Sequence, residues 1–210
     1  MDKPPQYSHT PLNVINEIIR YGYPRMVTER MDQGCEAYLI SFMFHPLRGS
    51  QRGVMQQMEK EVERVFATLL NQMFRHPSKI PTLEMPLWIV APDFPVPKRN
   101  KQSLREVTLN GGLHYQGVAL QPPGSRLNCP LDAHFEVRQD LYVRPGHALA
   151  RVHAMPITHD PNYVVEYSFK AIQRGRADFD NVLILPKLHS QMPSDVPFRA
   201  TPRFRTLNVG

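Results

Sequence analysis

Two short groups of residues in this sequence have the types and the spacing that metal-assisted chemistry on a phosphate needs. The first is His114-Tyr115-Gln116, in a stretch whose alternating pattern predicts a strand. Residues i and i+2 of a strand project from the same face, so the imidazole of His114 and the amide oxygen of Gln116 should converge. Such a pair suits Mn²⁺ or Mg²⁺, especially if a carboxylate completes the set. The alternative is a hydrogen-bonded histidine on a half-buried strand.

The second group is Tyr167-Ser168-Phe169-Lys170, within a predicted helix. Positions i and i+3 of a helix lie on one face, so the phenol of Tyr167 and the ammonium of Lys170 should be neighbours. A nearby cation lowers the pKa of a tyrosine and can neutralise the charge that builds on a phosphate under attack. The alternative is a stripe of core residues that contains Tyr167.

The hydrophobic pattern predicts the elements that position these groups. Strands are expected at residues 36–44, 87–91, 113–120, 148–158 and 182–185, and helices at 14–19, 53–76 and about 160–174. Gly22 and Pro24 are expected to end the first helix, and Asp160-Pro161 is expected to start the last one. The pattern at 131–143 fits either a short strand or a helix.

This order of elements predicts an α+β fold, a ferredoxin-like antiparallel sheet with helices packed on one face. We divide the chain into an N-terminal extension with a short helix (1–35), a main domain (36–188) and a tail rich in proline and arginine (189–210). The fold alone does not indicate a function, because many unrelated activities share it.

Composition narrows the class of protein. The chain of 210 residues has 25 Lys and Arg against 19 Asp and Glu, a formal net charge of +6, which favours a polyanionic partner such as nucleic acid. Its two cysteines, Cys35 and Cys129, are far apart and have no CxxC partner, which argues against a disulfide framework or a cysteine zinc site. Without an apolar run of eighteen residues or a signal sequence, we expect no membrane insertion or secretion, and a location in a bacterial cytoplasm or in the host compartment that contains the replicating DNA.

Three motifs taken in order resemble the HUH endonuclease superfamily, which includes rolling-circle replication initiators, relaxases and transposases of single-stranded mobile elements. They are an apolar strand with Ser-Phe (Leu39 to Phe44), a strand with His-hydrophobic-Gln-Gly (His114 to Gly117) and Tyr-x-x-Lys on a helix (Tyr167 to Lys170). The His-x-Gln-Gly form is similar to that of initiators of circular single-stranded-DNA viruses and some plasmids. The resemblance covers roughly residues 36–174.

The resemblance implies an activity and a role for each motif. Tyr167 would attack a phosphodiester of single-stranded DNA, leaving a 5′-phosphotyrosine and a free 3′-hydroxyl that can attack back to rejoin the strand. His114 and Gln116 would hold the divalent cation, Mn²⁺ or Mg²⁺, and Lys170 would orient the phosphate or a metal-bound water. Asp93, directly after the predicted strand at 87–91, is the first choice for an acidic metal ligand, and Glu106 is the second.

Three features depart from the family pattern. The first motif lacks the Thr-x-Asn ending that viral initiators often have, with Met43-Phe44-His45 in its place, and the gap between this motif and the strand with His114 is longer than in the compact viral domains. A GxxxxGK[ST] phosphate loop is also absent, so an initiator of this kind would need a separate helicase.

Two other classes of function remain open at this stage. A non-catalytic nucleic-acid-binding module of the same fold would read RNA or DNA through an aromatic sheet face and would be indifferent to chelators. A structural or interaction protein would bind nucleic acid weakly, without the salt dependence that phosphate contacts produce.

Overall fold

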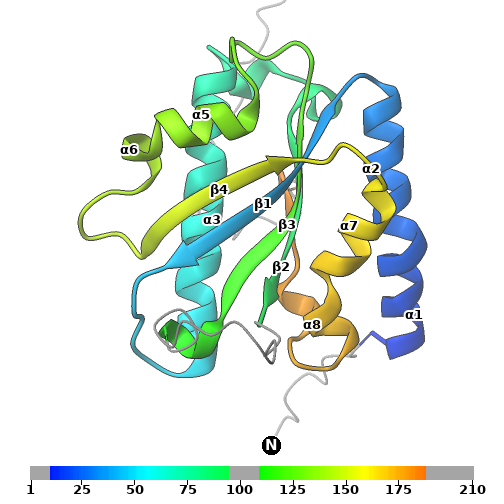
Figure 1. Ribbon diagram of the computed structural model, residues 1–210, viewed down its shortest axis with the longest axis vertical. Coiled ribbons are helices and arrows are strands. Elements are labelled where there is room, and N and C mark those ends of the chain that lie inside the picture. Colours follow the sequence, from blue (N-terminus) through cyan, green and yellow to red (C-terminus); the bar gives the residue numbers. More distant parts are fainter. Residues whose placement is uncertain (1–9, 95–108, 188–210) are drawn as a thin grey trace, which may run out of the picture.

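The computed structural model of this protein describes residues 10–94 and 109–187. Five strands form one antiparallel sheet in the order β4-β1-β3-β2-β5. Their bounds are β1 Glu36–Phe44, β2 Leu87–Asp93, β3 His114–Gln121, β4 Leu149–Pro156 and β5 Leu183–Leu185. The order of the first four strands, with one helix between β1 and β2 and others between β3 and β4, is the ferredoxin-like arrangement that we predicted (Figure 1).

The helices of this ferredoxin-like core lie on one face of the sheet, as expected. They are α3 (Gln51–Met73), α5 (Leu131–Val137) and α6 (Gln139–Tyr142), which settles 131–143 as helical. Ser50 caps α3 by accepting a hydrogen bond from the backbone N–H of Gly53 at 3.2 Å, which satisfies one of the free donors of the first turn. The buried stripe of α3 packs with Phe42 and Trp88 of the sheet in the larger hydrophobic core.

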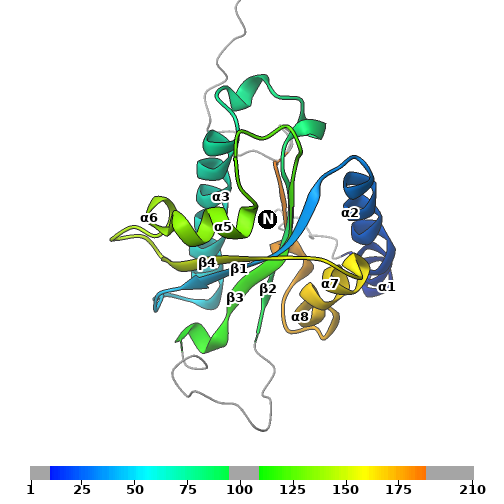
Figure 2. The same cartoon turned by 45° about the horizontal axis from the view of Figure 1, so that its top comes forward.

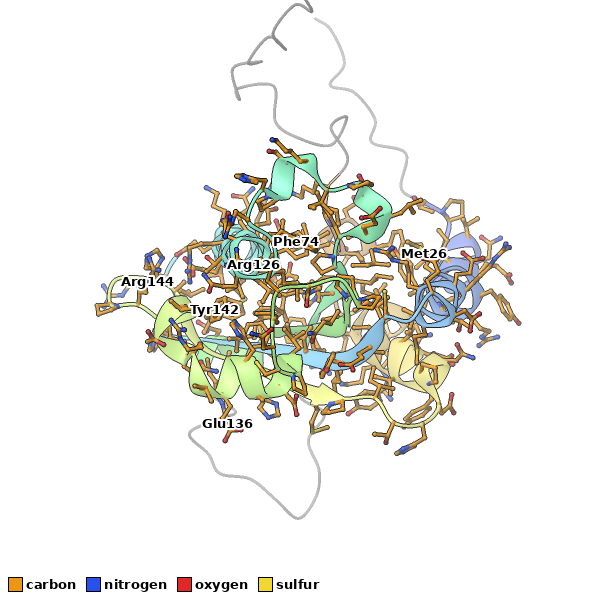
Figure 3. The ribbon with its side chains drawn as sticks, turned by 90° about the horizontal axis from the view of Figure 1, so that it is seen from above. Met26, Phe74, Arg126, Glu136, Tyr142 and Arg144 are labelled. Atoms are coloured by element: carbon orange, nitrogen blue, oxygen red, sulfur yellow. The ribbon has the colours of Figure 1, made fainter. Side chains whose placement is uncertain are left out.

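A second helical layer covers the other face of the sheet, which the sequence pattern did not reveal. It consists of α1 (Leu12–Glu17), a π-helical turn (Ile18–Gly22), α2 (Tyr23–Asp32), α7 (Pro161–Ser168) and α8 (Lys170–Gln173). Figures 2 and 3 show the sheet between the two layers; Met26 of α2 and Tyr142 of α6 lie on opposite sides of the molecule. A smaller hydrophobic core fills this side, with Tyr23 stacked on Phe169 at 5.0 Å between ring centroids.

The second layer corrects the predicted end of the first helix. Gly22 and Pro24 do not stop it, because the helical path continues through the π turn to Asp32. Pro24 stands in the first turn of α2, where a missing N–H costs little, and the burial of Tyr23 and Val27 outweighs the poor helix propensity of Gly22. The described part of the segment 1–35 therefore packs against the sheet of the main domain.

The other predicted elements are confirmed with small changes in their bounds. Asp160 begins α7 as predicted, and its Oδ1 accepts a hydrogen bond from the backbone N–H of Tyr163 at 3.0 Å. Short 3₁₀ turns occupy Pro77–Lys79, Thr82–Glu84, Leu109–Gly112 and Phe179–Asn181. Among the described residues, no helix combines the length and the apolar character needed to cross a bilayer.

Candidate functional site

Asp93 is the centre of the candidate site. It is the last residue of β2, where it pairs with His114 of β3, and its side chain is only 1% exposed. Its Oδ2 accepts hydrogen bonds from Lys170 Nζ at 2.5 Å and from Gln116 Nε2 at 2.9 Å. Three residues singled out in the sequence, from three different elements, therefore meet at one carboxylate oxygen.

His114 completes this group. Its Nε2 lies 3.5 Å from Asp93 Oδ2, and its Nδ1 lies 3.0 Å from the carbonyl oxygen of Gly112. Because a carbonyl oxygen can only accept, this contact assigns the proton to Nδ1. A metal ion held beside Asp93 would find the Nε2 lone pair of this tautomer available as a ligand.

Strand alternation places His114 and Gln116 on the site side of the sheet and Tyr115 on the other, as the spacing predicts. Tyr115 is fully buried in the larger core, where its hydroxyl lies 3.1 Å from Glu59 Oε1 and 3.3 Å from the carbonyl oxygen of Asn181, so that these two acceptors share its one proton. Burial, reinforced by the charge of Glu59, raises the pKa of Tyr115 far above its ordinary value. This phenol is therefore a packing residue and is unsuited to act as a nucleophile.

Tyr167 and Lys170 are neighbours, but they do not share one regular helix. The helical path breaks at Phe169 (φ −101°, ψ 11°), so Tyr167 lies near the end of α7 and Lys170 begins α8. Lys170 Nζ nevertheless lies 4.0 Å from the centroid of the Tyr167 ring, within the range of a cation–π contact. The phenol, the ammonium and Asp93 thus form a continuous series of contacts.

The two sides of the helical path from α7 to α8 differ in exposure. Val165 of α7, Phe169 at the break and Ile172 of α8 lie in the smaller core, while Tyr163 and Tyr167 of α7 are 63% and 42% exposed. The interpretation of Tyr167 as a buried core residue is therefore wrong, because the core-facing stripe runs along the opposite side of the helix. The rings of Tyr163 and Tyr167 stack on the surface at 6.1 Å between centroids.

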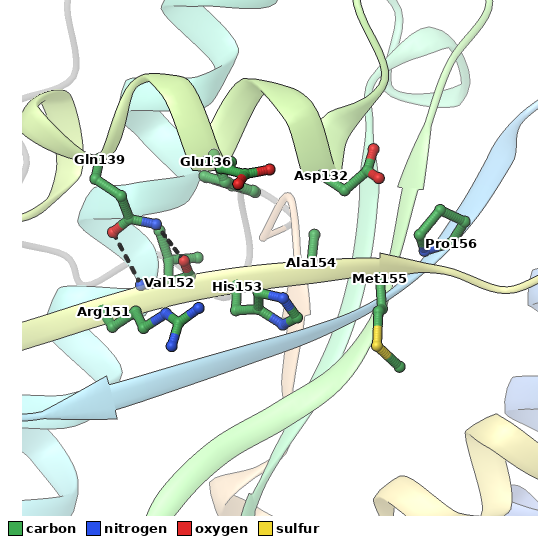
Figure 4. Close-up of a pocket in the computed structure, with 10 residues that line it drawn as sticks. Asp132, Glu136, Gln139, Arg151, Val152, His153, Ala154, Met155 and Pro156 are labelled. Atoms are coloured by element: carbon green, nitrogen blue, oxygen red, sulfur yellow. Dashed lines mark hydrogen bonds between the residues drawn. The ribbon is translucent and has the colours of Figure 1, made fainter.

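An open strip of the sheet leads away from the site toward the β4 edge. In the strand register His153 lies opposite Ser41, and Ser41 lies opposite Gln116, so the three side chains form one row across neighbouring strands. Arg151 and Met155 flank His153 on the same face of β4 and are exposed. Figure 4 shows Arg151, His153 and Met155 pointing away from α5. We call Ser41, Met43, Arg151, His153 and Met155 the polar strip.

Sequence reasoning missed the polar strip. The signal was the alternation of exposed Arg151, His153 and Met155 with buried Val152 and Ala154 along β4. The alternation alone does not tell which face of the sheet these side chains occupy. The pairing of β4 with β1, and of β1 with β3, places them on the same face as Gln116.

The donor set fits a divalent cation by its chemistry. An imidazole nitrogen, a carboxylate and an amide that can offer its oxygen would come from His114, Asp93 and Gln116. Asp93 Oδ1 is buried and finds no hydrogen-bond partner among the residues that the structure describes, which leaves one carboxylate oxygen unsatisfied there. No cluster of three or more His, Cys, Asp or Glu arranged for a metal occurs within 10–94 and 109–187, and the second-choice ligand Glu106 lies outside these described residues.

Comparison of the chain with protein-family models, with curated proteins and with solved structures finds no match in any of the three.

Proposed function

We propose that this protein is a metal-dependent endonuclease of the HUH type, which nicks and rejoins single-stranded DNA through a 5′-phosphotyrosine at Tyr167. The observation that carries the proposal is the contact of Lys170 with both Asp93 and the ring of Tyr167. Through Lys170, the exposed ring of Tyr167 is linked to the carboxylate that His114 and Gln116 also contact, which supports attack by this phenol on a metal-bound phosphate.

The chemistry follows from these groups. The oxygen of Tyr167 attacks phosphorus as its proton is lost to solvent, the bond to the 3′-oxygen breaks, and the 3′-oxygen takes up a proton. Attack by the same 3′-hydroxyl reverses the step, since the ester of tyrosine retains the bond energy. A Mg²⁺ or Mn²⁺ ion held by Asp93, His114 and Gln116 would withdraw charge from the phosphate and align it. Lys170 would supply a second positive charge on the side of the phenol.

The surroundings of the site support a single-stranded substrate. Exposed rings at Tyr163 and Tyr167 offer faces on which unpaired bases can stack. Arg151 and His153 of the polar strip place hydrogen-bond donors along an open face that continues from Gln116. The net charge of +6 favours the same partner. We also propose that the protein acts in the cell compartment where such single-stranded DNA is replicated.

The decisive experiment is detection of a covalent protein–DNA adduct. The full chain is incubated with a library of single-stranded oligonucleotides and Mn²⁺, and adducts are separated on a denaturing gel. We expect adducts with the wild type and with Tyr163→Phe, which removes the equivalent hydroxyl one turn away, and none with Tyr167→Phe or with EDTA. Full adduct yield in Tyr167→Phe would show that another residue is the nucleophile.

The second candidate is a non-catalytic module that binds nucleic acid on the same face. The exposed aromatic pair and the polar strip favour it as much as they favour the enzyme. It predicts oligonucleotide binding without adducts, and affinities that EDTA and Tyr167→Phe leave unchanged.

A further inference from the structure

Lys170 engages the carboxylate that a metal ion would need. Its ammonium lies 2.5 Å from Asp93 Oδ2, the oxygen to which Gln116 also donates and from which His114 Nε2 is 3.5 Å away. The other ring nitrogen of His114, Nδ1, contacts the carbonyl oxygen of Gly112. Of these three neighbours of Asp93, Lys170 is the one with an ammonium group.

We propose that Lys170 is a built-in competitor for the divalent cation: its ammonium neutralises Asp93 until an ion displaces it, and the displaced ammonium then serves the phosphate beside Tyr167. This inference rests on the metal site of the proposed function. It assigns Lys170 two successive positions, one on Asp93 and one on the substrate.

Burial is the physical reason for competition. An ionised carboxylate with 1% exposure must be paired with a positive charge or with strong donors. Two cations on a single carboxylate repel one another across a few ångströms of poorly screened space. A divalent ion and the Lys170 ammonium therefore cannot both keep short contacts with Asp93, and binding of the ion is an exchange.

The groups differ in their freedom to move. Asp93, His114 and Gln116 belong to paired strands in the middle of the sheet, where the ladder holds their backbones. Lys170 begins a helix of four residues after the break at Phe169, and its side chain is 13% exposed beside an exposed Tyr167. A flexible four-carbon stem lets the ammonium withdraw toward solvent without moving the backbone.

Asp93 Oδ1 is a second oxygen that the ion would contact once Lys170 has left Oδ2. It is buried, and none of the described residues donates a hydrogen bond to it, so the incoming ion would satisfy this oxygen as well. Rotation of the Gln116 amide then turns its oxygen toward the site in place of Nε2. The departing ammonium has the Tyr167 ring at 4.0 Å, where a phosphate under attack would need a positive charge.

Metal binding measured without DNA tests the exchange. Isothermal titration of the full chain with MnCl₂ compares the wild type with Lys170→Met, which removes charge and donor, and with Lys170→Gln, which keeps a donor for Asp93 but no charge. We expect both variants to bind Mn²⁺ about tenfold more tightly, because a like charge beside the ion is removed. Lys187→Met is the matched control, since Lys187 pairs with Glu63 at a distance from the site, and its affinity should equal that of the wild type.

The outcomes separate the exchange from the metal site itself. In one outcome, the wild type binds Mn²⁺, Asp93→Asn does not, and both Lys170 variants bind the ion with equal or weaker affinity than the wild type. This result would overturn the competition and leave the proposed function standing. Absence of Mn²⁺ binding in every protein, or binding that Asp93→Asn does not change, would overturn the metal site and the inference together.

A measurement on the wild type avoids dependence on the folding of variants. In nitrogen-detected NMR of ¹⁵N-lysine-labelled protein, the Nζ resonance of Lys170 should shift as MgCl₂ is added, while that of Lys187 stays in place. A Lys170 resonance that does not move although Mg²⁺ binds would contradict the exchange.

Discussion

Lys170 Nζ and Asp93 Oδ2 lie 2.5 Å apart although 77 positions separate the two residues in the chain. The contact ties α8 of the second helical layer to the end of β2 in the ferredoxin-like core. Because Tyr167 precedes Lys170 by three residues, the same contact fixes where the exposed phenol lies relative to the sheet. One ion pair thus serves both the packing of the second layer and the assembly of the candidate site.

Asp93→Asn should weaken folding as well as metal binding. The substitution leaves the Lys170 ammonium without its counter-charge, and breaking a buried pair is costly, although the 13% exposure of Lys170 allows partial escape to water. We expect a loss of about 2 kcal/mol in the free energy of unfolding. Urea denaturation of Asp93→Asn and of the exposed control Asp140→Asn measures it, and equal stabilities of the two variants would contradict a structural role for the pair.

Gly117→Ala should disrupt the sheet beside the site. A Cβ at this position would lie 2.1 Å from the carbonyl oxygen of Ile89 and 2.5 Å from Cα of Val90, so β2 would have to move. We expect a loss of about 3 kcal/mol of stability or insoluble protein. Gly124→Ala, with no atom within 4 Å of the added Cβ, should change stability by less than about 0.5 kcal/mol. Thermal and urea unfolding followed by circular dichroism compare the two.

Arg151→Ala tests the polar strip. If the strip carries the backbone of single-stranded DNA, removal of one cation should lower affinity for all sequences alike and reduce the slope of log affinity against log salt by about one. Fluorescence anisotropy with labelled oligonucleotides at several salt concentrations measures both quantities. Arg138→Ala is the control, because Arg138 is exposed between α5 and α6, away from the strip, and pairs with Asp140. Equal effects of the two variants would indicate attraction by net charge alone.

His134 should make stability depend on pH. Burial, aided by the charge of Arg138, lowers the pKa of His134 below its ordinary value of 6.5, and its Nε2 lies 2.7 Å from the hydroxyl of Tyr142. Below pH 6.5 His134 binds a proton more readily in the unfolded chain than in the folded chain. The contribution of His134 to the free energy of unfolding is therefore complete above pH 6.5 and is lost as the pH falls.

The variant His134→Gln isolates this effect, since it keeps a polar partner for Tyr142 but cannot titrate. Between pH 7 and pH 5 the free energy of unfolding should fall less steeply for His134→Gln than for the wild type. The exposed His159→Gln should keep the wild-type slope. Urea denaturation at a series of pH values provides the slopes, and identical slopes in all three proteins would refute the assignment.

Much of the fold could be predicted from local pattern. The stripe of α3, the strands around Trp88 and His114 and the cap at Asp160 are confirmed, because 3.6-residue and two-residue periodicities report directly which side of an element is buried. The helix through Gly22 and Pro24 escaped prediction, since its stability comes from burial of Tyr23 and Val27 against distant partners.

The amino-acid sequence by itself determined the candidates: an imidazole and an amide two residues apart, a phenol and an ammonium three apart, and an acid at the end of a strand. Tertiary structure alone decided that Asp93 is shared by His114, Gln116 and Lys170, that Tyr167 faces solvent, and that the polar strip continues the site. The reason is that spacing along the chain controls only neighbours within one element, whereas contacts between elements depend on which face each helix covers and how the strands are ordered.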